Sequence, residues 1–196
     1  MVEILNNSLY LAVGQPLGAV PTGPDDGLQY GIRVGGTFFH LPFEGYDLWH
    51  RALVGATHED LVTIATRQGS LDDLDDNVAF FQEAGLLVAW HGPNPAVALA
   101  SDLRLLSTGV GDGVDGADRT RYTILSRAGT PACTVDFLSY VFWSYCDGRN
   151  TVVQAADATA AHCQVPPDAV LERAGQLVPL LVRHALVFLD RVGDKR

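Results

Sequence analysis

The chain repeats itself at an offset of 94 residues. Most of the matching pairs are aromatic, apolar or glycine: Leu9 with Leu103, Leu11 with Leu105, Arg33 with Arg127, Gly35 with Gly129, Leu41 with Val135, Phe43 with Phe137, Trp49 with Trp143 and Thr57 with Thr151. Further on the offset grows to 100, where Gly85-Leu86-Leu87 matches Ala185-Leu186-Val187. A copy of this length can enclose a small core of its own, unlike a solenoid repeat. The sequence therefore predicts two copies of one domain, at 1–91 and 102–196, joined by a linker at 92–101.

Local patterns in the first copy predict strands, then three helices, then a closing strand. The expected strands are 3–5, 9–13, 28–34, 37–41 and 86–90. Gly35-Gly36 is a two-residue hairpin signal between two of them. Segment 14–27 contains three prolines and is expected to be a loop. The first helix should carry an apolar face of Tyr46, Trp49, Leu53 and Val54. The second helix should span 58–67 and begin with a capping box formed by Thr57 and Asp60. The third helix should bury Leu74, Val78, Phe81 and Ala84.

The second copy repeats this plan. Its expected strands are 103–106, 122–127, 131–135 and 186–189, with an acidic loop at 109–118. Its expected helices are 136–146, 151–162 and 166–184. This order of elements is that of a winged helix-turn-helix domain. We therefore expect an α+β fold of two tandem winged helix-turn-helix domains, each with a small antiparallel sheet and three helices. Trp49 and Trp143 should occupy equivalent buried sites.

Charge separates the two halves. Residues 1–100 hold 12 acidic and 3 basic residues, a balance of −9, whereas residues 101–196 hold 11 acidic and 10 basic residues, a balance of −1. An acidic surface repels phosphates and favours cationic or neutral partners, so nucleic acid is not an expected partner.

No apolar run is long enough for a membrane span, and the first residues do not form a signal peptide, so we expect a cytoplasmic protein without a membrane partner. Cys133, Cys146 and Cys163 are expected to be buried, reduced thiols.

From Phe137 onward the second copy resembles the PqqD-like family, small domains that recognise precursor peptides in pathways for ribosomally made, modified peptides. The matching segments are Phe142-Trp143, Asp147-Gly148-Arg149-Asn150-Thr151-Val152, Val165-Pro166-Pro167-Asp168-Ala169-Val170 and Ala185-Leu186-Val187. The first copy keeps Leu48-Trp49, Thr57 and Gly85-Leu86-Leu87 but lacks the Asp-Gly turn. The similarity covers about half of the chain.

The resemblance implies a domain that is not an enzyme and needs no cofactor. In that family the leader of a precursor peptide docks as an added strand on a sheet edge, beside helix three. For the first copy this implies an edge at Thr37, Phe38, Phe39, His40 and Leu41, with Val78 and Phe81 in the groove wall. For the second copy it implies an edge at Pro131, Ala132, Cys133 and Val135, with Val170, Arg173, Ala174 and Leu177 in the wall.

The two copies differ as docking sites. Pro131 removes one backbone donor from the second edge, which slightly favours the first copy, although the resemblance is stronger in the second. Acidic residues at 72–76 would suit a basic peptide, and Arg173 would suit an acidic leader. The sequence leaves open which copy binds the peptide. It also leaves open whether the protein forms a homodimer.

No catalytic or metal-binding motif is present in the sequence. The six histidines are isolated, and the acids at 72–76 complement the dipole of a helix start. We therefore expect a non-catalytic protein that binds a leader peptide and presents it to a peptide-modifying enzyme. Two alternatives stay open: a winged-helix DNA-binding transcription regulator, which would need arginine or lysine on its recognition helix, and a protein–protein adaptor.

Overall fold

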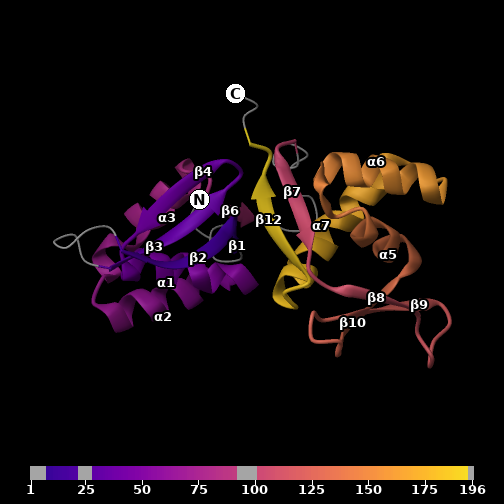
Figure 1. The fold of residues 1–196 in the computed structure, drawn as a ribbon, viewed down its shortest axis with the longest axis horizontal. Helices are drawn as coiled ribbons and strands as arrows, with labels where there is room; N and C mark the ends of the chain where they lie inside the picture. Colours follow the sequence, from indigo (N-terminus) through magenta and orange to yellow (C-terminus); the bar gives the residue numbers. More distant parts are fainter. Residues whose placement is uncertain (1–7, 22–27, 92–100, 194–196) are drawn as a thin grey trace. The chain divides into compact units, whose positions relative to one another are not determined.

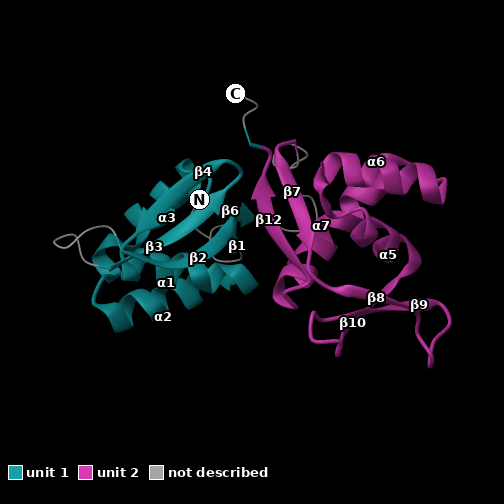
Figure 2. Cartoon of the chain, in the orientation of Figure 1, with its two compact units in different colours: residues 1–91, 193–196 teal, residues 92–192 magenta. Residues whose placement is uncertain are grey.

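A computed structural model of the chain describes residues 8–21, 28–91 and 101–193 (Figure 1). The chain divides into two compact units, residues 1–91 with 193–196 and residues 92–192 (Figure 2). Across the described ranges the fold is α+β, with six α-helices and four antiparallel three-stranded sheets. No helix in these ranges is both long and apolar enough to cross a membrane. The predicted strand at 3–5 and most of the predicted linker lie outside the described residues.

The first unit contains two sheets and three α-helices. Its elements are β1 (Leu9–Ala12), β2 (Gln15–Pro21), β3 (Leu28–Val34), β4 (Thr37–Leu41), α1 (Phe43–Arg51), the 3₁₀ turn η2 (Ala52–Val54), β5 (Ala56–Thr57), α2 (His58–Gln68), η3 (Leu71–Asp73), α3 (Leu74–Glu83) and β6 (Leu87–Trp90). One sheet has the order β5-β1-β6 and the other has the order β2-β3-β4. The chain therefore leaves the first sheet after β1, builds the second sheet, and returns to the first.

The second unit has the same plan. Its elements are β7 (Leu103–Ser107), β8 (Val110–Val114), β9 (Arg121–Leu125), β10 (Pro131–Asp136), α5 (Phe137–Ser144), β11 (Asp147–Thr151), α6 (Val152–Cys163), α7 (Pro167–Arg183) and β12 (Val187–Arg191). Its sheets have the orders β11-β7-β12 and β10-β9-β8. Each sheet of this unit thus has a counterpart in the first unit with the same strand order.

Two segments predicted to be loops contain strands. β2 lies within 14–27 and β8 within 109–118, so each unit has two sheets where we expected one. Both strands are at the edge of a sheet, where a proline costs no ladder hydrogen bond if its nitrogen faces outward. Their pairing with β3 and β9 shifts register next to Gly18 and Gly113, whose φ angles are positive. Proline and glycine at an edge are therefore compatible with strands here.

The helix starts follow the predicted signals. The side chain of Thr57 accepts a hydrogen bond from the backbone N–H of Asp60, and the Asp60 carboxylate accepts one from the backbone N–H of Thr57, which confirms the predicted capping box. Thr151 and Gln154 form the same box at the start of α6. The apolar face predicted for the first helix is wrong at Val54, which is exposed. α1 ends at Arg51 and gives way to a 3₁₀ turn, whose tighter winding changes the direction of the following side chains.

An aromatic cluster recurs in both units and aligns them more accurately than the sequence offset. Tyr30 stacks on Tyr46 with ring centroids 4.7 Å apart, and Tyr122 lies 4.9 Å from Tyr140. Tyr122 therefore corresponds to Tyr30 at an offset of 92, two less than predicted. The difference arises because ten residues separate the paired Tyr30 and Leu41, whereas twelve separate the paired Tyr122 and Val135, whose hairpin has the longer loop, 126–130. Arg127 consequently lies in the longer loop, and its predicted match with Arg33 of β3 is wrong.

The two matched tryptophans differ in their hydrogen bonds. Trp49 Nε1 donates to the carbonyl oxygens of Leu86 at 3.0 Å and Val13 at 3.3 Å, whereas Trp143 Nε1 is buried and has no hydrogen-bond partner among the described residues. Phenylalanine removes the N–H group from either site. We expect Trp49→Phe to lower the free energy of unfolding by about 1 kcal/mol more than Trp143→Phe. Urea unfolding of both variants measures this difference, and equal losses would contradict it.

A candidate peptide groove beside β10

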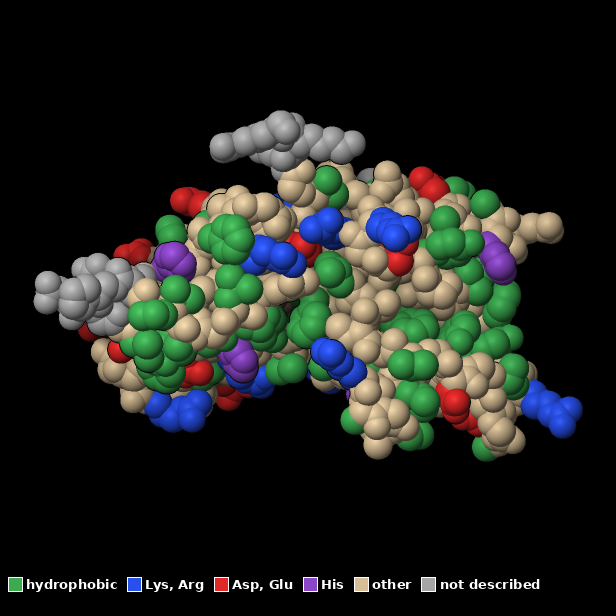
Figure 3. Space-filling view, in the orientation of Figure 1, with side chains coloured by type: hydrophobic (Ala, Val, Ile, Leu, Met, Phe, Trp, Pro, Cys, Tyr) green, Lys and Arg blue, Asp and Glu red, His purple; other side chains and the backbone are tan. Residues whose placement is uncertain are grey.

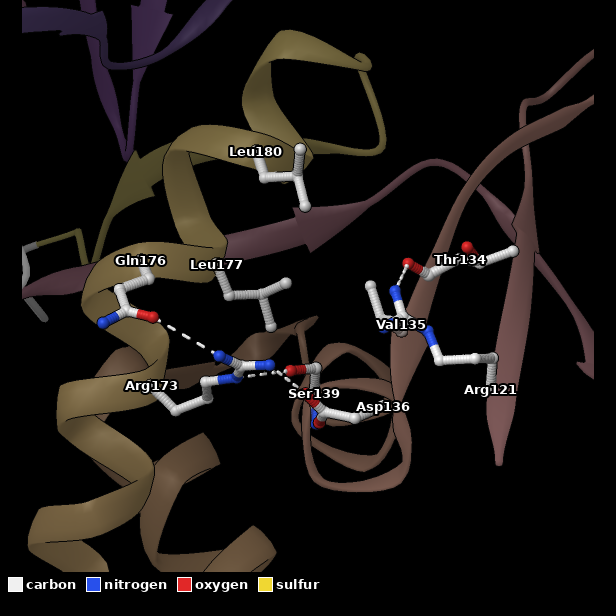
Figure 4. Close-up of a pocket in the computed structure, with 9 residues that line it drawn as sticks. All are labelled: Arg121, Thr134, Val135, Asp136, Ser139, Arg173, Gln176, Leu177 and Leu180. Carbon is white, nitrogen blue, oxygen red and sulfur yellow. Dashed lines mark hydrogen bonds and ion pairs between the residues drawn. The ribbon is translucent and has the colours of Figure 1, made fainter. Parts of the chain in front are cut away.

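A pocket lies between the edge strand β10 and helix α7 of the second unit (Figure 4). We call it the β10–α7 groove. Its lining residues are Thr134, Val135 and Asp136 of β10, Arg173, Gln176, Leu177 and Leu180 of α7, Arg121 of β9 and Ser139 of α5.

The position of β10 in its sheet leaves one side of the strand open. The sheet order is β10-β9-β8, so β10 pairs with β9 on one side and with no other described strand. Val135 pairs with Tyr122, and Asp136 pairs with Arg121. An edge strand of this kind presents unpaired backbone N–H and C=O groups. The groove therefore combines a free strand edge with a helical wall.

A polar network fixes the start of α5 against α7. Asp136 caps α5, because its Oδ1 accepts a hydrogen bond from the backbone N–H of Ser139 at 2.8 Å. Asp136 Oδ2 forms an ion pair with the guanidinium of Arg173. Arg173 Nε donates to Ser139 Oγ at 3.1 Å, and its Nη1 donates to Gln176 Oε1 at 3.3 Å (Figure 4). These contacts define the polar end of the groove.

Arg121 brings a second positive charge to the groove. Its Nη2 donates to the backbone carbonyl of Thr134 at 2.6 Å, and its buried Nε has no hydrogen-bond partner among the described residues. Arg121 makes no ion pair in the described part of the chain, although its charge helps to lower the pKa of the half-buried Asp115 and of the exposed Asp118. The lining thus holds two arginines and one carboxylate.

Asp136 is ionised more readily than an ordinary aspartate. Burial raises its pKa, but the hydrogen bond from the Ser139 N–H and the contacts with Arg173 together outweigh burial and lower the pKa below its usual value. A carboxylate whose pKa is lower in the folded state stabilises the fold above its unfolded pKa. That stabilisation is lost as the pH falls through the folded pKa.

This shift predicts a pH-dependent effect of Asp136→Asn. Asparagine still caps a helix, so the variant removes the charge and keeps the cap. Because the ion pair is more than a third exposed, we expect the variant to lose about 1 kcal/mol or less at pH 6.5, and the loss to shrink as the pH falls below about 4. Urea unfolding across this range measures it. Asp157→Asn, on the exposed surface of α6, is the matched control, and an Asp136 effect that stayed constant with pH would contradict the assignment.

The structure brings together three of the residues predicted for the second copy. Val135, Arg173 and Leu177 all line the groove. Val170 and Ala174 are buried in the core and do not line it, while Pro131 is exposed and Ala132 and Cys133 are half-buried on β10. The sequence reading missed Gln176 and Leu180, although with Arg173 and Leu177 they follow the i, i+3, i+4, i+7 spacing of one helix face.

The first unit offers an edge strand with different surroundings. β4 is at the edge of the β2-β3-β4 sheet; Thr37, Phe38 and His40 are exposed, Phe39 is half-buried and Leu41 is buried. The predicted wall residues Val78 and Phe81 are only 8% and 2% exposed, so they belong to the core. At the offset of 100 that relates the two third helices, Asp73, Asp76 and Phe80 take the places of Arg173, Gln176 and Leu180. The corresponding surface of the first unit is therefore acidic.

The cysteines and histidines add no chemistry to the groove. Cys146 is buried, and Cys133 and Cys163 are half-buried, so the prediction of three buried thiols is wrong for two of them. Burial raises the pKa of all three thiols, which keeps them protonated. Among the described residues, no group of three or more His, Cys, Asp or Glu side chains could hold a metal ion.

The chain was compared with protein-family models, with curated proteins and with solved structures. None of the three comparisons found a match. A proposal for function must therefore start from the groove and from the residues that form it.

Proposed function

We propose that this protein is a non-catalytic peptide-recognition protein of the cytoplasm. It binds the leader of a ribosomal precursor peptide by strand addition to β10 and presents it to a peptide-modifying enzyme. Each unit is, in this proposal, a winged helix-turn-helix domain with an added sheet. The observation that carries the proposal is the open edge of β10 beside a groove walled by α7 of the same unit.

The geometry of the groove suits an extended peptide. The backbone of an added strand would pair with the free edge of β10, which supplies affinity independent of sequence. Alternate side chains of a strand point to the same face, so every second peptide residue would enter the groove. There they would meet the side chain of Leu180, with Val135 and Leu177, each 4% exposed, beneath it in the lining of the groove. Leu180 is 38% exposed, so an apolar peptide side chain could cover it.

The DNA-binding alternative has less support from the charges. A recognition helix must bring arginine or lysine to phosphates and base edges. In the second unit Arg173 is engaged by Asp136, and in the first unit the surface of α3 and the turn before it carries Asp73, Asp75 and Asp76. The adaptor alternative draws on the hydrophobic side chains exposed on both units (Figure 3). Phe38 and Val114 are among the exposed ones.

Selection from a displayed library of random peptides tests the proposal with the full chain as bait. We expect binders that lose at least tenfold in affinity with Leu180→Glu, because the new carboxylate would sit unpaired under the peptide. The matched control is Phe80→Glu, since Phe80 holds the corresponding position of α3 and is 52% exposed. Circular dichroism and thermal melting check that both variants fold. Loss of binding with Phe80→Glu alone would place the site in the first unit, and a library without binders would reject the proposal.

A further inference from the structure

We infer that the β10–α7 groove selects a peptide segment in which an acidic residue stands two positions before an apolar residue. This inference rests on the proposed function, because it specifies the peptide that the same site binds. It follows from three features of the groove: its charge, the order of polar and apolar groups along it, and the spacing between them.

The charge of the groove favours a carboxylate. Arg121 and Arg173 line it against the single carboxylate of Asp136. The guanidinium of Arg121 has no ion-pair partner among the described residues, and its one hydrogen bond there goes to the backbone oxygen of Thr134. A guanidinium without a carboxylate partner, beside an apolar wall, gains most from an acidic ligand. In the first unit Asp73 and Asp76 hold the places of Arg173 and Gln176, so the same peptide would be repelled there.

Polar and apolar groups follow one another along the groove. Arg173, Leu177 and Leu180 succeed each other up α7, and Figure 4 shows Arg173 beside Asp136 and Ser139, with Leu180 at the far end. Along β10 the order is reversed, because Asp136 at its end is the residue that meets Arg173. A peptide that runs antiparallel to β10 would therefore pass the arginine first and the leucines second.

The spacing fits alternate residues of a strand. Arg173 and Leu177 are four residues apart on a helix, which is about 6 Å along its axis. Two residues of a strand span about 6.6 Å. Asp136 meets Arg173 and pairs with Arg121 across the β9–β10 ladder, so both arginines lie at the same end of the groove. Residues i and i+2 of the peptide can therefore face Arg121 at this end and Leu177 together. Antiparallel pairing is the more stable of the two strand directions, which sets the acidic residue before the apolar one.

The test compares the sequences selected by two baits, the wild-type chain and Arg121→Gln. We expect wild-type binders to be enriched in Asp or Glu two positions before Leu, Ile, Val, Phe or Met. In one selected peptide, Asp→Asn should weaken binding to the wild type roughly tenfold and binding to Arg121→Gln much less. Arg127→Gln, in the exposed β9–β10 loop, is the control and should behave as the wild type. Raising the salt concentration should reduce the difference.

The outcomes separate this inference from the proposed function. Binders that need Leu180 but show no acidic preference would overturn the inference and leave peptide binding intact. An equal Asp→Asn effect in wild type and Arg121→Gln would also overturn the role of Arg121 in the selection. Selected sequences with the apolar residue first would reverse the inferred direction. A library that yields no binder to the wild type would overturn the proposed function itself.

Discussion

Replacing either Trp49 or Trp143 with alanine is expected to lower the free energy of unfolding by about 3–5 kcal/mol. The two side chains are 0% and 6% exposed, so each substitution opens a large cavity in a core. Each indole also lies against a tyrosine of its own helix, with ring centroids 5.7 Å apart for Tyr46 and 5.8 Å for Tyr140. Because each unit forms a core of its own, the loss should be confined to the unit that carries the substitution.

Amide exchange read separately for the two units measures this effect. Trp49→Ala should speed exchange in β1, β6 and α1 and leave β7, β12 and α5 unchanged, and Trp143→Ala should do the reverse. Exchange, rather than a single melting curve, is needed because a chain of two units need not unfold in one step. A loss below about 1 kcal/mol at either position would contradict the cavity argument. Equal acceleration in both units would contradict the independence of their cores.

Gly14 and Gly109 should also be intolerant of alanine, because each lies where the chain passes from one sheet to the other. A Cβ on Gly14 would lie 2.7 Å from the backbone oxygen of Arg33, and a Cβ on Gly109 would lie 2.7 Å from that of Leu125. We expect alanine to cost about 1–3 kcal/mol at Gly109 from the clash. At Gly14, whose φ is +108°, backbone strain should add about 1–3 kcal/mol more.

Two other glycines provide controls for this prediction. A Cβ on Gly36 or Gly116 would meet nothing within 4 Å, and neither residue has a positive φ. Urea unfolding should therefore show losses for Gly14→Ala and Gly109→Ala and little change for Gly36→Ala and Gly116→Ala. If Gly14→Ala were as stable as Gly36→Ala, the close approach of the β1–β2 connection to β3 would be wrong.

The helices and the two central hairpins could be predicted from the sequence, because their signals are local. Thr57 and Thr151 mark helix starts by their capping boxes, and Gly35-Gly36 marks a hairpin. β2 and β8 could not be predicted, because the glycines of both strands and the prolines of β2 are typical of loops. They form strands only because a partner strand lies beside them. In β2 and β8, pairing with a neighbouring strand outweighs the low strand propensity of glycine and proline.

The groove could be predicted only in part for a similar reason. Val135, Arg173 and Leu177 were expected from the resemblance and from the pattern of the third helix. Arg121 was not, because its place opposite Asp136 depends on the β9–β10 register, which a longer hairpin loop sets. The repeat could not predict the position of Arg121, because a constant offset of 94 pairs the wrong residues in the β9–β10 hairpin. Pairing between Asp136 and Arg173 likewise depends on how α7 lies against α5.

Amide exchange of the full chain with and without a library-selected peptide tests strand addition at β10 most directly. Amides of β10 that do not bond to β9 are expected to exchange rapidly in the unbound chain, and an added strand should slow them. We predict protection of residues 132–136 together with α7 around Leu177, and no change along β4 in the first unit. Protection of β4 and α3, or of helix surfaces with β10 unaffected, would contradict binding at the β10–α7 groove.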